Sequence, residues 1–366
     1  MGDIKIPTTF AIAGGGWRTG AYINIAAAMP ELFKLGGMFV RNREKGAVIE
    51  ARHGIPTFRS LDEMLTTAKP DFVVTSVPWQ VNPGVIDAIV AADVAVLSET
   101  PPAPDLEGLL SIYNHVEAGA KIQVAEQYNF QPFNAARISL VHSGRLGNIT
   151  QAQVSISHGY HGISIMRRLL GTGFKNCTVS GRIFSADLVE GPGRYGLPEK
   201  ESIIVSRQQI IQFDWEDRLG ILDFTGDQYF SWVRNERLLV RGDRGEIINE
   251  HATWLADYRT PISADFIRQE TGQRGNLEGR HLKGYLLGGE WIYSNPCGGA
   301  RLSDDEIAIA TSLQSMVDYL HGGNEFYSVA DACQDHYLSL LAEKAISSGE
   351  KIASEDQPWT PSARSV

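Results

Sequence analysis

A cluster of glycines stands where a short apolar stretch of the chain ends. Residues 10–13 are apolar, and Gly14-Gly15-Gly16-Trp17-Arg18-Thr19-Gly20 follows directly. This pattern predicts a buried strand that turns sharply into a helix, where close backbone approach and the positive helix end favour a pyrophosphate. The spacing departs from G-x-G-x-x-G because Thr19 holds the sixth position, so a plain strand–helix turn is the alternative. The predicted cofactor contacts at this turn are Gly14, Gly16, Trp17 and Arg18.

Two further groups of side chains could move protons. Tyr128 follows the predicted strand at residues 122–125, where the ends of parallel strands face a ligand crevice. A half-buried packing aromatic is the alternative. His161 opens a predicted helix and titrates near neutral pH, so it could be an acid, a base or a structural histidine. Helical spacing puts Ser164 and Arg168 on its face, and His158 precedes it by three residues. Arg168 could hold a substrate anion or lie on a solvated surface.

The first part of the chain alternates short apolar runs with helical segments, which predicts parallel strand–helix–strand units. Predicted strands cover residues 9–13, 37–40, 56–58, 72–76, 95–98 and 122–125. Predicted helices cover residues 21–29, 44–53, 61–67, 83–91 and 106–118. Six strands with intervening helices predict a doubly wound α/β Rossmann domain over residues 1–126, and this domain would position the glycine turn and Tyr128.

The pattern changes after residue 126. β-rich runs occupy residues 149–157, 178–184, 202–213, 219–225, 230–233 and 238–241, and predicted helices cover 160–170, 303–320 and 329–347. These elements predict an α+β domain over residues 127–366, with a large, mostly antiparallel open sheet and flanking helices. Ser303, followed by three acidic residues, predicts a helix N-cap. Residues 257–284 carry four arginines among glycines and predict a long excursion that serves as an interface or a lid.

The composition narrows the class of partner. The 366 residues are 43% hydrophobic and 21% charged, with a formal charge of −10, which argues against a nucleic-acid or anionic-membrane surface. Cys177, Cys297 and Cys333 are odd in number and widely spaced, so they predict neither a disulfide framework nor a metal site. We find no secretion signal and no membrane-length apolar run, and we expect a cytoplasmic protein that acts on small molecules.

The order of these elements resembles the Gfo/Idh/MocA family, named for glucose-fructose oxidoreductase and inositol dehydrogenase. Glu99-Thr100-Pro101 after the fifth predicted strand and Tyr160-His161 at the start of a helix carry the resemblance, which spans nearly the whole chain. It implies a nicotinamide-dependent sugar or polyol dehydrogenase. It also implies an open sheet that forms homodimers or homotetramers.

Two signatures of that family are altered in this chain. The family's usual Glu-Lys-Pro has a lysine that helps to move the proton, whereas Thr100 stands here, and its hydroxyl cannot be a cationic proton donor. The family's histidine is usually followed three residues later by aspartate, whereas His161 is followed by Ser164. A nicotinamide-dependent glycosidase branch of the family lacks the lysine and uses a tyrosine in a similar place. The resemblance therefore implies Tyr128 and His161 as the catalytic residues.

The cofactor type is read after the second strand. An acidic residue there would bind the ribose diol of NAD, but this chain has Arg41-Asn42-Arg43, so we favour NADP over NAD. By resemblance, the loop after the fourth strand lies beside the nicotinamide ribose, with Trp79 either walling the pocket or packing, and with Asn82 where the family often has histidine. The remaining predicted cofactor contacts are Arg41, Asn42, Ser76, Val77, Pro78, Glu99 and Thr100.

Three functions are consistent with these residues. The first is an oxidoreductase that transfers a hydride to or from a secondary alcohol of a sugar, cyclitol or sugar acid. The second is an NAD-dependent glycosidase that oxidises a ring hydroxyl transiently. The third is a cofactor-binding protein with little catalysis. For the enzymes, the predicted substrate contacts are Trp79, His158, Ser164 and Arg168.

Overall fold

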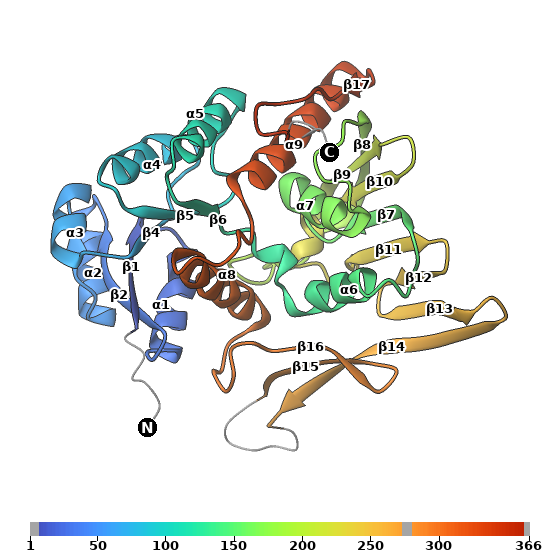
Figure 1. Cartoon of the computed structure of the whole chain (residues 1–366), viewed down its shortest axis with the longest axis horizontal. Helices are drawn as coiled ribbons and strands as arrows, with labels where there is room; N and C mark the ends of the chain where they lie inside the picture. Colours follow the sequence, from blue (N-terminus) through green and yellow to red (C-terminus); the bar gives the residue numbers. More distant parts are fainter. Residues whose placement is uncertain (1–6, 273–279, 362–366) are drawn as a thin grey trace. The chain divides into compact units, whose positions relative to one another are not determined.

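The chain folds into two compact units, each assembled from segments that are distant in the sequence. A computed structural model describes residues 7–272 and 280–361, coloured along the chain in Figure 1. Unit 1 comprises Met1–Pro132, Glu270–Leu282 and Asn295–Cys333. Unit 2 comprises Phe133–Gln269, Lys283–Ser294 and Gln334–Val366.

Unit 1 is built on a parallel sheet whose strand order is β3-β2-β1-β4-β5-β6. The strands are β1 (Thr8–Ala13), β2 (Phe33–Phe39), β3 (Thr57–Phe58), β4 (Phe72–Thr75), β5 (Ala95–Ser98) and β6 (Ile122–Val124). Strands β4 and β5 are buried over their whole length, as expected of strands covered by helices on both faces. The order confirms the predicted doubly wound sheet and brings the carboxyl ends of β1 and β4 together.

Helices flank this sheet in Figure 1. They are α1 (Thr19–Ala28), α2 (Arg43–His53), α3 (Leu61–Ala68), α4 (Asn82–Ala91), α5 (Leu106–Glu117), the 3-10 helix η1 (Gln127–Asn129) and α8 (Asp304–Leu320). Although α8 is far along the chain, it packs against α1. Ser303 is its N-cap, as predicted, and forms a capping box with Glu306.

Unit 2 is built on a sheet with the order β16-β15-β14-β13-β12-β11-β7-β10-β9-β8-β17. Its strands are β7 (Ile149–Ser155), β8 (Thr178–Val189), β9 (Ile203–Asp214), β10 (Leu219–Phe224), β11 (Arg237–Gly242), β12 (Gly245–Ile248), β13 (His251–Asp257), β14 (Thr260–Thr271), β15 (His281–Leu287), β16 (Glu290–Ser294) and β17 (Ile352–Ala353). Strands β7 and β10 pair in parallel, whereas pairs such as β8–β9 and β11–β12 are antiparallel. The sheet therefore confirms the predicted, mostly antiparallel architecture.

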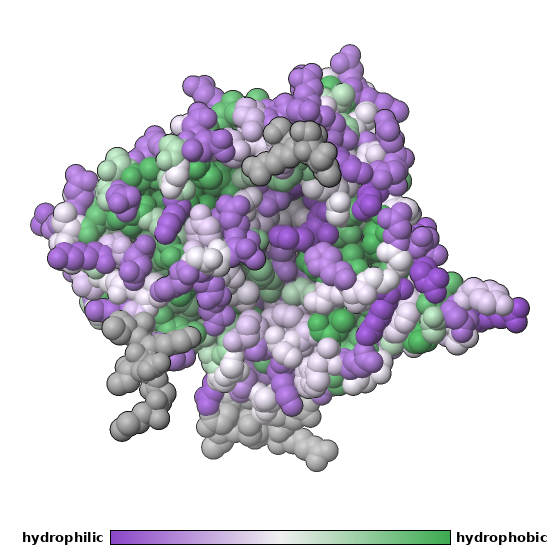
Figure 2. All heavy atoms as spheres, in the orientation of Figure 1, coloured by the Kyte–Doolittle hydropathy of each residue, from purple (hydrophilic) through white to green (hydrophobic). Residues whose placement is uncertain are grey.

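Four further elements lie among the described residues. They are α6 (Pro132–His142), α7 (Gly159–Leu170), the 3-10 helix η2 (Gly226–Tyr229) and α9 (Val329–Ser348). Helix α7 packs on β7 and β10, which fixes its first turn beside the end of β7. The hairpin of β13 and β14 projects from the sheet, and its tip is mainly hydrophilic on the face seen in Figure 2. Of the helices in residues 7–272 and 280–361, none has the length and apolar character needed to cross a membrane.

Two sequence predictions were wrong. Residues 230–233 do not form a strand. The capping box of Thr225 and Gln228 stabilises η2 just before them. The Ser231 hydroxyl then accepts hydrogen bonds from the N–H groups of Val233 and Arg234, which forms a turn. Residues 257–284 are not a loop excursion over their described part, because β14 and β15 occupy most of it. Residues 273–279 of that segment, including Arg274, lie outside the described residues.

Candidate functional site

The glycine turn of unit 1 lies where three strands of its sheet end. Gly14 follows β1 with φ of 127°, and a Cβ built on it would overlap the carbonyl oxygen of Ser76, which follows β4. The Ser76 N–H donates to Ala13 O at 2.7 Å, and the Gly14 N–H donates to Phe39 O, in β2, at 3.0 Å. Only glycine suits a close backbone approach with this φ. The turn is therefore a tight cradle without side-chain atoms at Gly14.

Helix α1 begins directly after this cradle. Its N-cap residue is Arg18, and no side chain caps the helix, so the positive end of the helix dipole is available to an anion. The space beside the Gly16 Cα is open, because a Cβ added there would come no closer than 4.0 Å to its nearest neighbour, Ser76 O. Trp17 is 65% exposed, and the Arg18 guanidinium lies 4.5 Å from its ring centroid. These residues fit a nicotinamide dinucleotide diphosphate.

A polar network joins Arg18 to the end of β5. Glu99 follows β5 and accepts a hydrogen bond from the buried Tyr22 hydroxyl at 2.6 Å, while Arg18 Nε lies 3.8 Å from the same oxygen. In the amide orientation that satisfies both of its groups, Gln127 accepts from Arg18 Nη2 at 2.6 Å. Burial, followed by the charge of Glu99, raises the pKa of Tyr22 well above its usual value. Tyr22 therefore remains a donor to Glu99.

We expect Tyr22→Phe to lower the free energy of unfolding by about 1–2 kcal/mol, because it removes one hydrogen bond to a charged, largely buried carboxylate. Chemical denaturation of the wild type and the variant measures this difference. An unchanged midpoint would show that Tyr22 does not hold Glu99. Since Glu99 also faces Arg18, the variant should weaken dinucleotide binding by only a few-fold.

The segment after β2 is exposed and lacks a carboxylate. Arg41, Asn42 and Arg43 are all exposed. Asn42 is the N-cap of α2, and its side chain accepts from the Lys45 N–H at 2.8 Å. The Asn42 side chain thus has a structural partner, whereas Arg41 precedes the helix on the surface. Arg41 and Arg43 are therefore accessible to a ligand.

The loops after β4 and β5 hold the other predicted cofactor contacts. Val77 is half-buried and Pro78 is exposed, while Trp79 is 43% exposed. Asn82 is buried at the start of α4, and its amide donates to Ser98 Oγ at 2.9 Å and to Pro102 O at 2.8 Å. These two hydrogen bonds hold the start of α4 against the end of β5 and the loop that follows it. Thr100 is half-buried beside Glu99.

Tyr128 lies in η1, directly after β6. The Glu126 carboxylate caps this 3-10 helix by accepting from the Tyr128 N–H at 2.9 Å, and Glu126 is itself fully buried. The Tyr128 side chain is half-buried. Its backbone is thus held firmly at the carboxyl edge of the parallel sheet, while its side chain remains partly accessible.

In unit 2, His158, His161 and Tyr229 form a histidine cluster, and Tyr229 is a member that the sequence analysis did not identify. Tyr229, the last residue of η2, has its hydroxyl 2.5 Å from His158 Nδ1 and 2.8 Å from Ser157 Oγ. The rings of His158 and His161 lie 5.1 Å apart, edge to face. His161 is buried, with 8% exposure. Because Tyr229 is 71 residues from His158, no spacing rule along the chain could have identified it.

The pKa of His158 is lowered to about 4, first by desolvation and second by the neighbouring His161 charge. His158 is exposed by area, but its Nδ1 edge is covered by Tyr229. Its ring is therefore neutral at physiological pH. With its Nδ1 bonded to the Tyr229 hydroxyl, the neutral ring and the phenol hold each other in place.

This shift predicts a pH-dependent stability. Between pH 6.5 and 4 the unfolded chain takes up a proton at His158 that the folded chain does not, so stability falls as the pH falls through this window. Allowing for the exposed part of the ring, we expect a loss of about 1 kcal/mol at pH 5. His158→Gln should flatten this part of the curve, as measured by melting temperatures between pH 4.5 and 7.5. An equal slope in the variant would contradict the assignment.

The other predicted substrate contacts on α7 are brought to one helix but differ in burial. Ser164 is buried and Arg168 is half-buried. The neighbouring Arg167 is buried and pairs with Asp335 at 2.6 Å, while also donating to Gly173 O. Arg167 thus has a structural role in an ion pair with Asp335. Arg168 is the arginine of α7 whose side chain is partly exposed to solvent. Among residues 7–272 and 280–361, no group of three or more His, Cys, Asp or Glu side chains is arranged to hold a metal ion.

Comparison with known proteins gives one family and many structures. Residues 8–127 match the Gfo/Idh/MocA family, described as an oxidoreductase family with an NAD-binding Rossmann fold. A search of curated proteins gives no match.

The similar solved structures include three dehydrogenases. Levoglucosan dehydrogenase in complex with NADH and levoglucosan is 16% identical, over 96% of this chain and 100% of its own, with a TM-score of 0.69. The WlbA dehydrogenase from Bordetella pertussis, in complex with NADH and UDP-GlcNAcA, is 15% identical, over 96% and 100%, with a TM-score of 0.63. The apo scyllo-inositol dehydrogenase from Lactobacillus casei is 17% identical, over 95% and 98%, with a TM-score of 0.63.

At these identities the structural likeness shows a shared fold. Residues 8–127 therefore match an oxidoreductase family with an NAD-binding Rossmann fold, and the chain as a whole shares its fold with these dehydrogenases.

Proposed function

We propose that this protein is a nicotinamide-dependent oxidoreductase acting on a secondary alcohol of a sugar, cyclitol or sugar acid. The observation that carries the proposal is the cradle formed by Gly14 and Ser76 at the start of α1, within a domain that matches an NAD-binding family. A nicotinamide bound there would supply the hydride acceptor or donor. The neighbours' ligands, levoglucosan and UDP-GlcNAcA, support a carbohydrate as the substrate class.

The chain's own residues would bind the cofactor and move one proton. Gly14, Gly16 and the α1 N-terminus would hold the diphosphate, with Arg18 anchored by Glu99. Tyr128 Oη in unit 1 is our first candidate for taking the alcohol proton, and His161 in unit 2 is the second. Arg168, Ser164 and His158 in unit 2 and Trp79 in unit 1 are proposed to contact the substrate.

A second function is favoured by one feature. Thr100 stands where the family has its lysine. The glycosidase branch, which oxidises a ring hydroxyl only transiently, also lacks this lysine. A dehydrogenase should raise absorbance at the reduced-nicotinamide band in proportion to product. The glycosidase should give no net absorbance change, yet should take up solvent deuterium beside the oxidised carbon. Binding without either signal would overturn both enzymatic proposals and leave a cofactor-binding protein.

The exposed Arg41 predicts a preference for NADP(H). Its guanidinium could make a charge-assisted hydrogen bond to the 2′-phosphate, so Arg41→Ala should weaken NADP⁺ binding about tenfold and leave NAD⁺ binding nearly unchanged. Arg52→Ala, an exposed arginine in the last turn of α2, is the matched control. Calorimetric titration of each variant with both dinucleotides measures the ratio. Tighter wild-type binding of NAD⁺ would reject this preference.

We also propose a homodimer or homotetramer working in the cytoplasm. The three cysteines are unpaired and buried, which suits a reducing compartment. Light scattering on the purified chain would test the oligomeric state.

A further inference from the structure

The loop between β8 and β9 forms an arm in unit 2 that is closed by its own hydrogen bonds. Its base is closed by the Glu190 N–H, which donates to Ser202 O at 2.9 Å, and by the Ser202 hydroxyl, which donates to the Glu190 carboxylate. Gly193 and Gly196 exchange two backbone hydrogen bonds, of 2.9 and 3.2 Å. These bonds pin a two-residue tip that carries Tyr195, whose side chain is 99% exposed. A pinned loop thus presents an aromatic ring to solvent.

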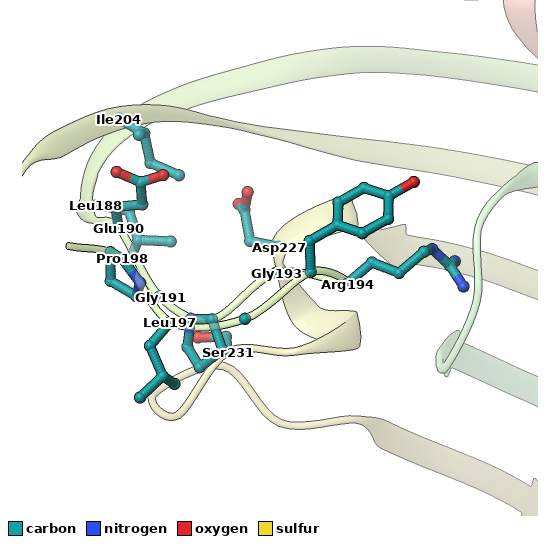
Figure 3. Close-up of a pocket in the computed structure, with 13 residues that line it drawn as sticks. Leu188, Glu190, Gly191, Gly193, Arg194, Leu197, Pro198, Ile204, Asp227 and Ser231 are labelled. Carbon is teal, nitrogen blue, oxygen red and sulfur yellow. The ribbon is translucent and has the colours of Figure 1, made fainter.

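A groove of about 360 Å³ lies under this arm, within the size range of ligand sites. In Figure 3, Glu190 and Asp227 present carboxylates to it, while Arg194 lies at the opposite end of the loop from Leu197 and Pro198. Apolar walls and two carboxylates therefore share one small space.

The far wall of the groove is the same short helix that carries the histidine cluster's tyrosine. Asp227 of η2 is held by the hydroxyls of Thr225, at 2.7 Å, and Ser206. Two residues later, Tyr229 bonds to His158. Phe230 follows, with its ring centroid 6.5 Å from that of Tyr229 and 5.7 Å from the Arg194 guanidinium. The contacts of Arg194 with Phe230, of Phe230 with Tyr229 and of Tyr229 with His158 therefore connect the groove to the histidine cluster.

The lining matches the chemistry of a sugar ring. Carboxylates accept hydrogen bonds from hydroxyl groups strongly, because these bonds are charge-assisted. The phenol ring of Tyr195 and the apolar side chains of Leu197 and Pro198 offer surfaces for the apolar face of a pyranose.

We propose that this groove binds a second sugar ring, linked glycosidically to the ring whose hydroxyl reacts, so that the natural substrate is a glycoside or oligosaccharide. The proposal rests on the proposed action on carbohydrates. It adds that the enzyme recognises its substrate beyond the reacting ring.

A second copy of the chain is the competing occupant. Trp232, Val233 and Leu197 are 70%, 72% and 69% exposed, and exposed apolar side chains also suit a protein interface. The carboxylates of Glu190 and Asp227 favour the sugar, because acidic residues are depleted at the core of protein interfaces. The experiment below separates the two.

Calorimetric titration with D-glucose, cellobiose and maltose tests the proposal, using the full chain saturated with whichever of NAD⁺ and NADP⁺ it binds more tightly. At least one disaccharide should bind tenfold or more tightly than glucose, and saturation-transfer NMR should show contact with both of its rings. In the double variant Glu190→Gln, Tyr195→Ala this ratio should fall to near one. Tyr258→Ala, which removes another exposed tyrosine (74%) outside the groove, should keep the wild-type ratio.

Equal affinity for glucose and both disaccharides would overturn the proposal. So would a double variant that changes oligomeric state by light scattering while keeping the wild-type ratio, since the arm would then be an interface between copies. Sugar oxidation is followed separately by the reduced-nicotinamide absorbance. A disaccharide preference without oxidation would refute the proposed function alone, and oxidation without the preference would refute the groove alone.

Discussion

Replacing Gly14 with alanine is expected to reduce dinucleotide affinity at least 100-fold, equivalent to about 2.7 kcal/mol. The added Cβ would overlap the Ser76 carbonyl, and φ of 127° is a conformation that L side chains rarely adopt. The backbone of the cradle must therefore shift, which moves the N–H groups that would face the diphosphate. Calorimetric titration with NAD⁺ and NADP⁺ measures the loss.

Two variants keep this prediction testable if Gly14→Ala folds poorly. A Cβ on Gly16 would lie 4.0 Å from Ser76 O, so Gly16→Ala should fold but fill the approach to the phosphates, weakening binding about tenfold. A Cβ on Gly20 would meet nothing within 4 Å. Gly20→Ala should therefore bind normally and gain up to about 1 kcal/mol of stability from the helix. Wild-type affinity in folded Gly14→Ala and Gly16→Ala proteins would exclude this turn as the binding site.

The second large effect is expected at Tyr128. If its Oη accepts the alcohol proton, Tyr128→Phe should lower kcat by a factor of about 10²–10⁴, the usual contribution of one acid–base group. The dinucleotide Kd should change by less than about twofold, because the η1 backbone is held by the Glu126 carboxylate and not by the phenol. Single-turnover measurements at the reduced-nicotinamide band would isolate the chemical step.

His161→Asn and Tyr229→Phe are the matching experiments in unit 2. If His161→Asn loses activity and Tyr128→Phe keeps full activity, His161 and not Tyr128 takes the alcohol proton. Tyr229→Phe should then alter the pH profile of kcat, because it removes the hydroxyl bonded to His158 Nδ1. Full activity in Tyr128→Phe is in any case incompatible with the role proposed for that residue.

The parallel sheet was predictable because local and long-range signals agree there. Phe10, Ala11, Ile12 and Ala13 are all fully buried, as a continuous apolar run before glycines implies. The boundaries were less accurate. The second strand was predicted at residues 37–40 but covers Phe33–Phe39, and Gly36 and Gly37 both pack inside the sheet, where the Phe58 ring covers Gly37.

Strands β13 and β14 of the second sheet were not predicted, because polar side chains interrupt their apolar pattern. On β13 and β14, His251 pairs with Asp265 at 2.6 Å, and Ser263 lies 2.7 Å from the same ring. Such exposed polar side chains alternate with buried residues such as Ala252 and Phe266 and weaken the apolar signal of a strand. The site had the same limit. Glycine and histidine motifs were visible locally, but Tyr22 and Tyr229 act through partners more than 70 residues away.

The claim at the centre of this account is that unit 1 binds a nicotinamide dinucleotide at the glycine turn. Calorimetric titration of the purified chain with NAD⁺ and with NADP⁺ tests it most directly. We expect saturable binding of at least one dinucleotide at one site per chain, lost in Gly14→Ala and retained in Gly20→Ala. No heat and no rise in melting temperature with either dinucleotide would contradict it.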